Sequence, residues 1–171
     1  YWIHGYVLVV ERDTKLIMTD IFTVRIVDRR SNGVSDMREI LFKAKRKDNS
    51  EWVEGYYQKR FDLDGSEQHF IFWSKSYTVW EYVEIDSDTL CQYTGLTDKN
   101  GKKIWENDIL KANLDESHPE DITYIKILWN ECRFCVNENY STDIDALEKW
   151  DAEHFQVCGN IFDNAELLEV E

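Results

Sequence analysis

The sequence predicts a mostly β fold with a minor α part, and two observations lead to this prediction. Aromatic residues are abundant, with 7 Trp, 9 Tyr and 8 Phe among 171 residues, whereas Pro occurs once and Gly seven times. Aromatic side chains suit the pleated, half-buried surface of a sheet. The apolar residues also come in short runs separated by turn sequences such as Asp28–Gly33 and Asp98–Gly101, which is typical of consecutive strands. A hydrophobic content of 43% is enough to bury a core.

Residues 1–36 are expected to form a β extension in front of the main domain. Their apolar runs predict strands at residues 2–10, 16–18 and 21–27. Asn32-Gly33 favours a tight turn and places a boundary near residue 36. The pentad Trp2–Tyr6 (WIHGY) resembles Trp52–Tyr56 (WVEGY). The extension is therefore expected either to add a strand pair beside the main domain or to lie upstream of a natural start at Met37.

Residues 37–90 are expected to form a β-rich region. Residues 39–44 and 52–57 predict a hairpin, because a polar turn separates two runs of apolar and aromatic residues. Two more runs, 69–73 and 77–83, predict further strands before a polar sequence ends the pattern.

Residues 91–171 continue with strands. Asn100-Gly101 lies between apolar runs and is a strong hairpin signal. The predicted strands cover residues 92–96, 103–111, 122–129, 132–136 and 155–162.

One helix is predicted, at residues 143–153. Ile144, Leu147 and Trp150 recur at helical spacing, and Thr142 precedes them as a candidate N-cap. Residues 164–169 predict a terminal helical turn.

Charge is distributed unevenly along the chain. The formal net charge is −14, and residues 61–171 contain 25 acidic and 8 basic residues, whereas residues 37–60 contain 4 acidic and 7 basic ones. An acidic surface repels the phosphate backbone, so direct nucleic-acid binding is not expected. A protein partner with a basic surface stays open as an alternative, although solubility alone also explains the charge.

The sequence also indicates a cellular compartment. No apolar stretch approaches the about 18–20 residues of a membrane span, and no signal-peptide pattern is present. Four cysteines in a chain of this size are too few for a disulfide scaffold, and we expect them to be reduced and buried. The prediction is a cytoplasmic protein without a membrane partner.

Three segments carry a specific pattern. They are Met37–Ala44 leading to Trp52–Tyr56, the central run Gln92–Ile109 (QYTGLTDKNGKKIWENDI) and the ending Val157–Leu168 (VCGNIFDNAELL). In order and spacing they resemble the YopX family of phage and prophage proteins over residues 37–171, with residues 1–36 outside the resemblance. Where the family pattern usually has Gly and Pro, this chain has Asn107 and Ala165, which weakens local turn preference only.

The resemblance implies a strand-rich N-terminal region and an SH3-like small barrel around residues 92–162, with the helix inserted in it. It also implies a phage-encoded or prophage-encoded accessory protein in the cytoplasm of a bacterial host cell. The family is one of unassigned function, and the resemblance provides no catalytic residues. Small barrels have many unrelated binding tasks, so the fold alone does not assign a function.

A set of cysteine and histidine residues is the sharpest chemical candidate. Cys132-x2-Cys135 and His154-x3-Cys158 have the spacing of zinc ligands in each half. Against zinc, Cys132 and Cys135 fall on a predicted strand, where an offset of three places side chains on opposite faces. Buried cysteines that pack as small apolar residues explain the pattern without a metal, so we predict no metal and no cofactor.

Four aromatic residues form a candidate interaction surface: Trp73, Tyr77, Trp80 and Tyr82. They could stack on bases or nucleotides, but such residues more often fill a core or an oligomer interface. The carboxylates predict no catalytic pair, because nothing in the sequence shows two of them with separated pKa values.

We therefore predict a non-enzymatic protein that binds a protein partner and is also a candidate homo-oligomer. The alternative is an acidic counter-defence protein that mimics nucleic acid on a host protein or sequesters a nucleotide signal. A zinc-dependent protein is the second alternative.

Overall fold

The structure is a computed structural model. It describes residues 39–169 except Tyr77, Glu116, Pro119, Asn139 and Tyr140, together with the short paired strands β1 (Trp2–Ile3) and β2 (Tyr6–Val7). The chain divides into two compact units, one of residues 1–38 with 73–81 and one of residues 39–72 with 82–171. Apart from β1 and β2, the predicted extension at residues 1–36 lies outside the described residues.

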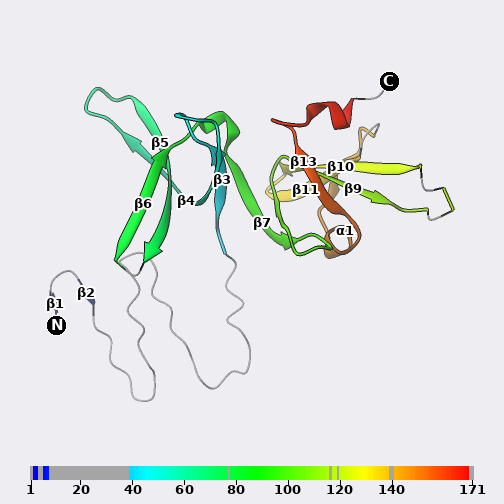
Figure 1. The fold of residues 1–171 in the computed structure, drawn as a ribbon, viewed down its shortest axis with the longest axis horizontal. Coiled ribbons are helices and arrows are strands. Elements are labelled where there is room, and N and C mark those ends of the chain that lie inside the picture. The colour runs from blue at the N-terminus through cyan, green and yellow to red at the C-terminus, as the bar shows by residue number, and fades with distance from the viewer. Residues whose placement is uncertain are drawn as a thin grey trace, which may run out of the picture. The chain divides into compact units, whose positions relative to one another are not determined.

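The strands form two larger antiparallel sheets (Figure 1). The six-stranded sheet has the order β6 (Val79–Glu84), β5 (Glu67–Ser76), β4 (Trp52–Phe61), β3 (Phe42–Lys45), β7 (Cys91–Thr97), β8 (Lys103–Trp105). The five-stranded sheet has the order β12 (Asp145–Ala146), β11 (Arg133–Glu138), β10 (Ile122–Asn130), β9 (Asp108–Asn113), β13 (Gln156–Asn160). The helical elements are η1 (Ser87–Thr89), α1 (Lys149–His154) and η2 (Ala165–Leu168).

The predicted mostly β class with a minor helical part is confirmed. The strands expected to form the SH3-like barrel divide between the sheets, because β7 and β8 belong to one and β9 to β13 to the other. The pairings of the described strands leave both sheets open, and the barrel stays a prediction.

The predicted strand at residues 103–111 is interrupted where the chain passes from one sheet to the other. Asn107 has a φ of 64°, a left-handed conformation that Asn tolerates better than most residues. Its N–H donates to the Ile127 carbonyl at 2.8 Å, and its own carbonyl accepts from the Ile161 N–H at 3.0 Å. This geometry explains why Asn can stand where the family pattern usually has Gly.

The core next to the five-stranded sheet contains residues of β9, β10, β11 and helix α1, together with Ile104 of β8. Ile125 and Ile127 alternate along β10 with their side chains buried, as period-two patterning requires. Ala152 and Phe155 from α1 and its C-terminal end join the same cluster. Among the described residues, no helix is long and apolar enough to cross a membrane.

Asp98 anchors the predicted turn at residues 98–101 to the neighbouring strand. Its carboxylate accepts hydrogen bonds from the N–H groups of Asn100 and Lys102 at 2.8 and 2.9 Å, and from Val157 on β13 at 2.8 Å. Although burial favours the protonated form, these three donors lower the pKa of Asp98 below its usual value. The buried carboxylate therefore has a structural role.

The helix predicted at residues 143–153 is shorter and begins later. Residues 145–146 pair with Val136 and Cys135 as strand β12, and the Leu147 N–H donates to the Phe134 carbonyl at 3.0 Å. Helix α1 starts only at Lys149, where Glu148 and Asp151 form a capping box in place of Thr142. Sheet pairing thus overrides the helical spacing in the first half of the segment. The predicted turn at residues 164–169 is confirmed by η2.

Candidate binding surface

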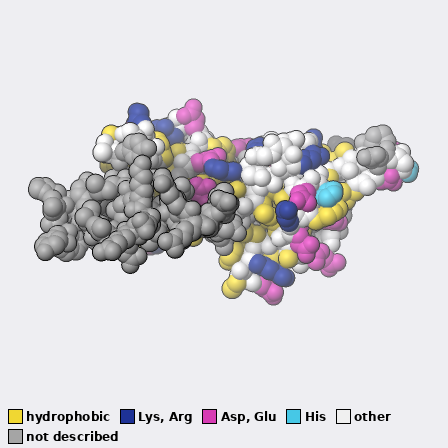
Figure 2. Space-filling model, turned by 90° about the horizontal axis from the view of Figure 1, so that it is seen from below, with side chains coloured by type: hydrophobic (Ala, Val, Ile, Leu, Met, Phe, Trp, Pro, Cys, Tyr) yellow, Lys and Arg dark blue, Asp and Glu magenta, His cyan; other side chains and the backbone are white. Residues whose placement is uncertain are grey.

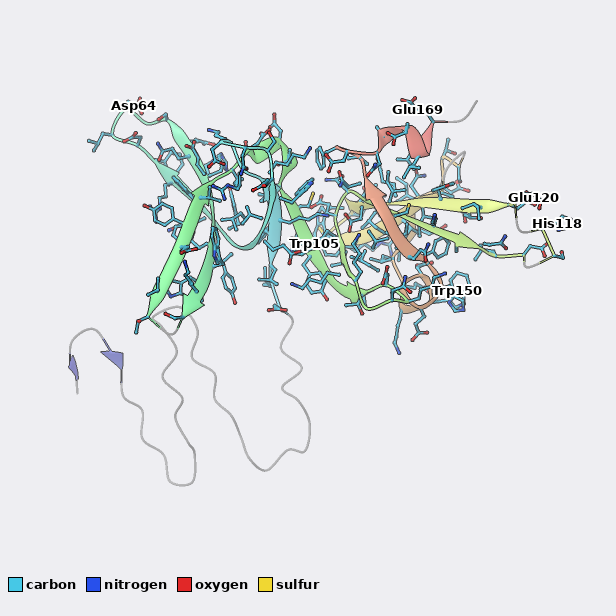
Figure 3. All side chains as sticks on the ribbon, viewed as in Figure 1. Asp64, Trp105, His118, Glu120, Trp150 and Glu169 are labelled. Carbon is cyan, nitrogen blue, oxygen red and sulfur yellow. The ribbon has the colours of Figure 1, made fainter. Side chains whose placement is uncertain are left out.

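The β4–β5 hairpin presents a regular two-sided ladder. Its register runs without a shift from Tyr56↔Phe72 through Gln58↔Phe70 to Arg60↔Gln68. Residues directly opposite each other share a face, and alternate residues along a strand do too. One face of the hairpin therefore carries these six side chains. The turn that joins the strands is marked by Asp64 in Figure 3.

Three of these side chains form a cluster with Tyr82 of β6. This cluster is here called the arginine–aromatic patch: Arg60, Phe70, Phe72 and Tyr82. Tyr82 of β6 stacks on Phe72 with ring centroids 5.1 Å apart and an interplanar angle of 24°. Phe70 meets Tyr82 edge to face at 5.8 Å. Tyr82 is 57% exposed and the two phenylalanines are half-buried, so part of the ring system packs on the sheet and part is open to solvent.

The Arg60 guanidinium lies over these rings. Its central carbon is 5.2, 5.0 and 5.6 Å from the ring centroids of Phe70, Phe72 and Tyr82, within the range of cation–π attraction. Two donors, Nε and Nη2, reach the side-chain oxygen of Gln58 at 3.2 and 3.1 Å. Within the described part of the chain, no carboxylate forms an ion pair with Arg60.

The opposite face of the hairpin is packed and partnered. Ile71 is fully buried there, and Tyr57 contacts Phe42 with centroids 5.5 Å apart. The Tyr57 hydroxyl is 2.7 Å from Nδ1 of His69. Lys59 pairs with Glu67 at 2.6 Å on this face. One face of the hairpin is therefore occupied by packing and polar contacts, and the other face presents Arg60.

An ion pair connects β3 of the six-stranded sheet to β9 of the five-stranded sheet. This ion pair and the polar contacts beside it are here called the polar joint. Nζ of Lys43 is 2.5 Å from Oδ1 of Asp108, and Oδ2 of Asp108 accepts from the Trp105 N–H at 2.9 Å. Lys43 also lies 5.0 Å from the Trp52 ring centroid. Trp105 is labelled in Figure 3.

A second ion pair of this joint predicts acid sensitivity. A hydrogen bond from Lys45, with further ones from Asn160 and Trp52, lowers the pKa of Asp163 to about 2 against the opposing effect of burial. An unfolded Asp titrates near about 3.9, so the pair contributes stability above this pH and loses it as the pH falls through about 2. We expect Asp163→Asn to flatten the decrease in melting temperature between about pH 4 and pH 2.

Melting followed by circular dichroism at each pH tests this expectation. Asp143→Asn, a change at an exposed aspartate without an ion pair in the described residues, is the matched control. The expectation would be contradicted if the melting temperatures of wild type and Asp163→Asn decreased equally over this pH range.

The four residues of the zinc hypothesis have separate environments. Cys132 is not on a strand as predicted, because Glu131 and Cys132, with φ of 46° and 65°, form the two-residue turn between β10 and β11. The Cys132 side chain is exposed, so the prediction that all four cysteines are buried was wrong for this residue, whereas Cys135 is buried. The Cys158 thiol donates to the Ile109 carbonyl at 3.3 Å. Among the described residues, no group of three or more His, Cys, Asp or Glu side chains is placed to hold a metal ion.

Cys91 is unsuited to nucleophilic chemistry. It is fully buried, and burial raises the pKa of its thiol to about 11. The nucleophilic thiolate form is therefore scarce at neutral pH.

Of the four aromatic residues predicted as an interaction surface, Tyr82 lies in the arginine–aromatic patch. Tyr77 lies outside the described residues, and Trp73 and Trp80 belong to the other compact unit. Sequence reasoning missed Arg60, Phe70 and Phe72. The alternation at 68–72 and 56–60 was the available signal, but only the strand register shows that these positions share a face.

Exposed carboxylates mark a second surface feature. Glu138, Asp143 and Asp145 on and beside β11 and β12 are exposed, and none has an ion pair in the described residues. On the face seen in Figure 2, acidic side chains occur at several places between hydrophobic and basic ones.

Comparison with known proteins gives a family match and two solved structures. A family model described as YopX protein matches residues 41–169. The crystal structure of protein EF1440 from Enterococcus faecalis is 26% identical, with 78% of this chain and 100% of that chain covered and a TM-score of 0.49. The crystal structure of protein yopX from Bacillus subtilis is 18% identical, with 79% and 99% covered and a TM-score of 0.47. No curated protein matches.

Proposed function

The chain belongs to the YopX family, and we propose that it is a non-enzymatic binding protein that contacts a protein partner through the arginine–aromatic patch. The observation that carries this proposal is the guanidinium of Arg60 held over three aromatic rings on an open sheet face. Its setting is the bacterial cytoplasm during phage or prophage growth, as the family resemblance implies.

The composition of the patch supports binding. Tyr, Phe and Arg are enriched at the centres of protein interfaces, because they bury a large area and lose little side-chain entropy when they are already positioned. The stacked Phe72 and Tyr82 rings limit the movement of both side chains. A partner therefore meets a surface that needs little rearrangement.

The buried ionisable groups support a binding role over a catalytic one. Asp98 anchors a turn, Asp108 neutralises a lysine, and Cys91 fills the core. Each has a structural task, and none faces an open site with a second, differently shifted group as acid–base chemistry requires.

Affinity capture with matched variants tests the proposal. Tagged protein is incubated with lysate from phage-infected bacteria, and captured proteins are quantified by mass spectrometry. Tyr82→Ala is expected to reduce recovery of the partner at least about tenfold, as truncation of a central interface aromatic does. The control is Trp150→Ala, which removes another aromatic side chain that is 49% exposed, on helix α1. Equal recovery by both variants and wild type would contradict the proposal.

A second candidate function is binding of a basic host surface by the acidic part of the chain, in the manner of a nucleic-acid mimic. The exposed Glu138, Asp143 and Asp145, which form no ion pair with another described residue, favour it. Such an interaction weakens steeply with salt, whereas contact through an aromatic patch does so less. Capture at low and high ionic strength separates the two.

A further inference from the structure

We infer that the arginine–aromatic patch takes a carboxylate-bearing peptide segment of its partner, in which Asp or Glu lies beside an apolar side chain. This inference rests on the proposed function and adds the chemistry of the partner.

The donors of Arg60 point to an acceptor with two oxygens. A guanidinium has five N–H donors in a planar fork, and the described structure directs two of its nitrogens to Gln58. Nη1 has no partner among the described residues. The fork matches a carboxylate in a bidentate pair, which is stronger and more directional than a contact with a lysine.

The rings under Arg60 define the rest of the ligand. Phe70, Phe72 and Tyr82 exclude water from one side of the guanidinium, which strengthens its interaction with an anion. Tyr56, paired with Phe72 on the same face, is 45% exposed and extends the apolar area. An apolar side chain next to the carboxylate can pack on these rings.

Charge favours a single carboxylate over a nucleic acid. Within the part of the chain that the structure describes, Arg60 is the one cation of the patch, because Lys59 lies on the opposite face and pairs with Glu67. A polyanion needs several cations that displace its counterions, and the whole chain carries a net charge of −14. One guanidinium is sufficient for one carboxylate.

Selection from a displayed library of random short peptides on the full chain tests the inference. We expect enrichment of Asp or Glu adjacent to Leu, Ile or an aromatic residue. An enriched peptide, labelled with a fluorophore, is then titrated by anisotropy beside its Asn or Gln counterpart. The amide counterpart is expected to bind at least about tenfold more weakly, because charge-assisted bonds are lost.

Variants locate the peptide on the patch. Arg60→Gln is expected to weaken binding of the acidic peptide at least about tenfold. In this variant, the acidic peptide and its amide counterpart are expected to bind with similar affinity. Arg60→Lys is expected to fall between Arg60→Gln and wild type. Arg133→Gln, at an exposed arginine of β11 in the other sheet, is the matched control and is expected to bind as wild type. Circular dichroism melts of each variant establish that it is folded.

Three results would overturn the inference: no acidic enrichment, equal binding by Arg60→Gln and Arg133→Gln, or displacement of the peptide by a single-stranded oligonucleotide. The outcome is separable from that of the proposed function. If Tyr82→Ala abolishes partner capture but the library yields no acidic peptide, the patch is the contact surface and the inferred chemistry is wrong. If Tyr82→Ala leaves capture unchanged, the proposed function itself fails.

Discussion

Replacing Asp108 with alanine is expected to lower the free energy of unfolding by about 3–5 kcal/mol, the range for breaking one side of a buried ion pair. Asp108 is 1% exposed, and its loss leaves the Lys43 ammonium without its counter-charge. The Trp105 N–H also loses its acceptor. Burial raises the pKa of Asp108, while Lys43 opposes the shift. The measurement is made at neutral pH.

Urea denaturation monitored by tryptophan fluorescence measures the change. The double variant Lys43→Met with Asp108→Leu is expected to be more stable than Asp108→Ala, because it leaves no unpaired buried charge. The exposed-site control Asp143→Ala is expected to stay within about 0.5 kcal/mol of wild type. If Asp108→Ala lowered the free energy of unfolding by less than about 1 kcal/mol, the stability of the protein would not depend on the Lys43–Asp108 ion pair.

Gly55→Ala is expected to destabilise the protein by at least about 3 kcal/mol, at the upper end for overpacking. A Cβ at Gly55 would lie 2.2 Å from the Phe72 carbonyl oxygen and 3.0 Å from Cγ2 of Ile71. The oxygen belongs to the backbone of the adjacent strand β5, so it cannot move without opening the β4–β5 ladder. Urea denaturation again provides the measurement.

Gly65 is the matched control for this substitution, in the turn of the same hairpin. It has a φ of +85°, and no atom lies within 4 Å of a Cβ built there. Gly65→Ala is therefore expected to cost only the backbone strain of about 1–2 kcal/mol. If the two variants were equally stable, close approach of the strands at Gly55 would not be the cause.

The positions of strands were predictable where runs of apolar residues are bounded by turn-forming residues. The Asn100-Gly101 turn and the strands on both sides of it occur as expected, because Gly101 supplies the φ of 81° that the turn requires. The first half of the predicted helix was wrong, because the pairing of Asp145 and Ala146 with β11 is a contact with a distant strand that helical spacing does not encode.

The candidate surface was predictable only in part. The aromatic residues between positions 73 and 82 predicted an interaction surface, which stays a prediction, and Tyr82 lies in the arginine–aromatic patch. Arg60 could not be assigned to this surface from the sequence. It belongs to β4, whereas the rings belong to β5 and β6, and only the register of β4 on β5 brings its guanidinium over them.

The sequence alone determined the mostly β class, the family and the acidic excess of the C-terminal part, because composition, turn residues and local motifs are properties of neighbouring positions. The tertiary structure decided which strands share a sheet, where the chain crosses between sheets, and which side chains meet across strands. These depend on pairings between residues far apart in the chain, and shifting a register by one position moves every side chain to the other face. Arg60 lies over its three rings for that reason.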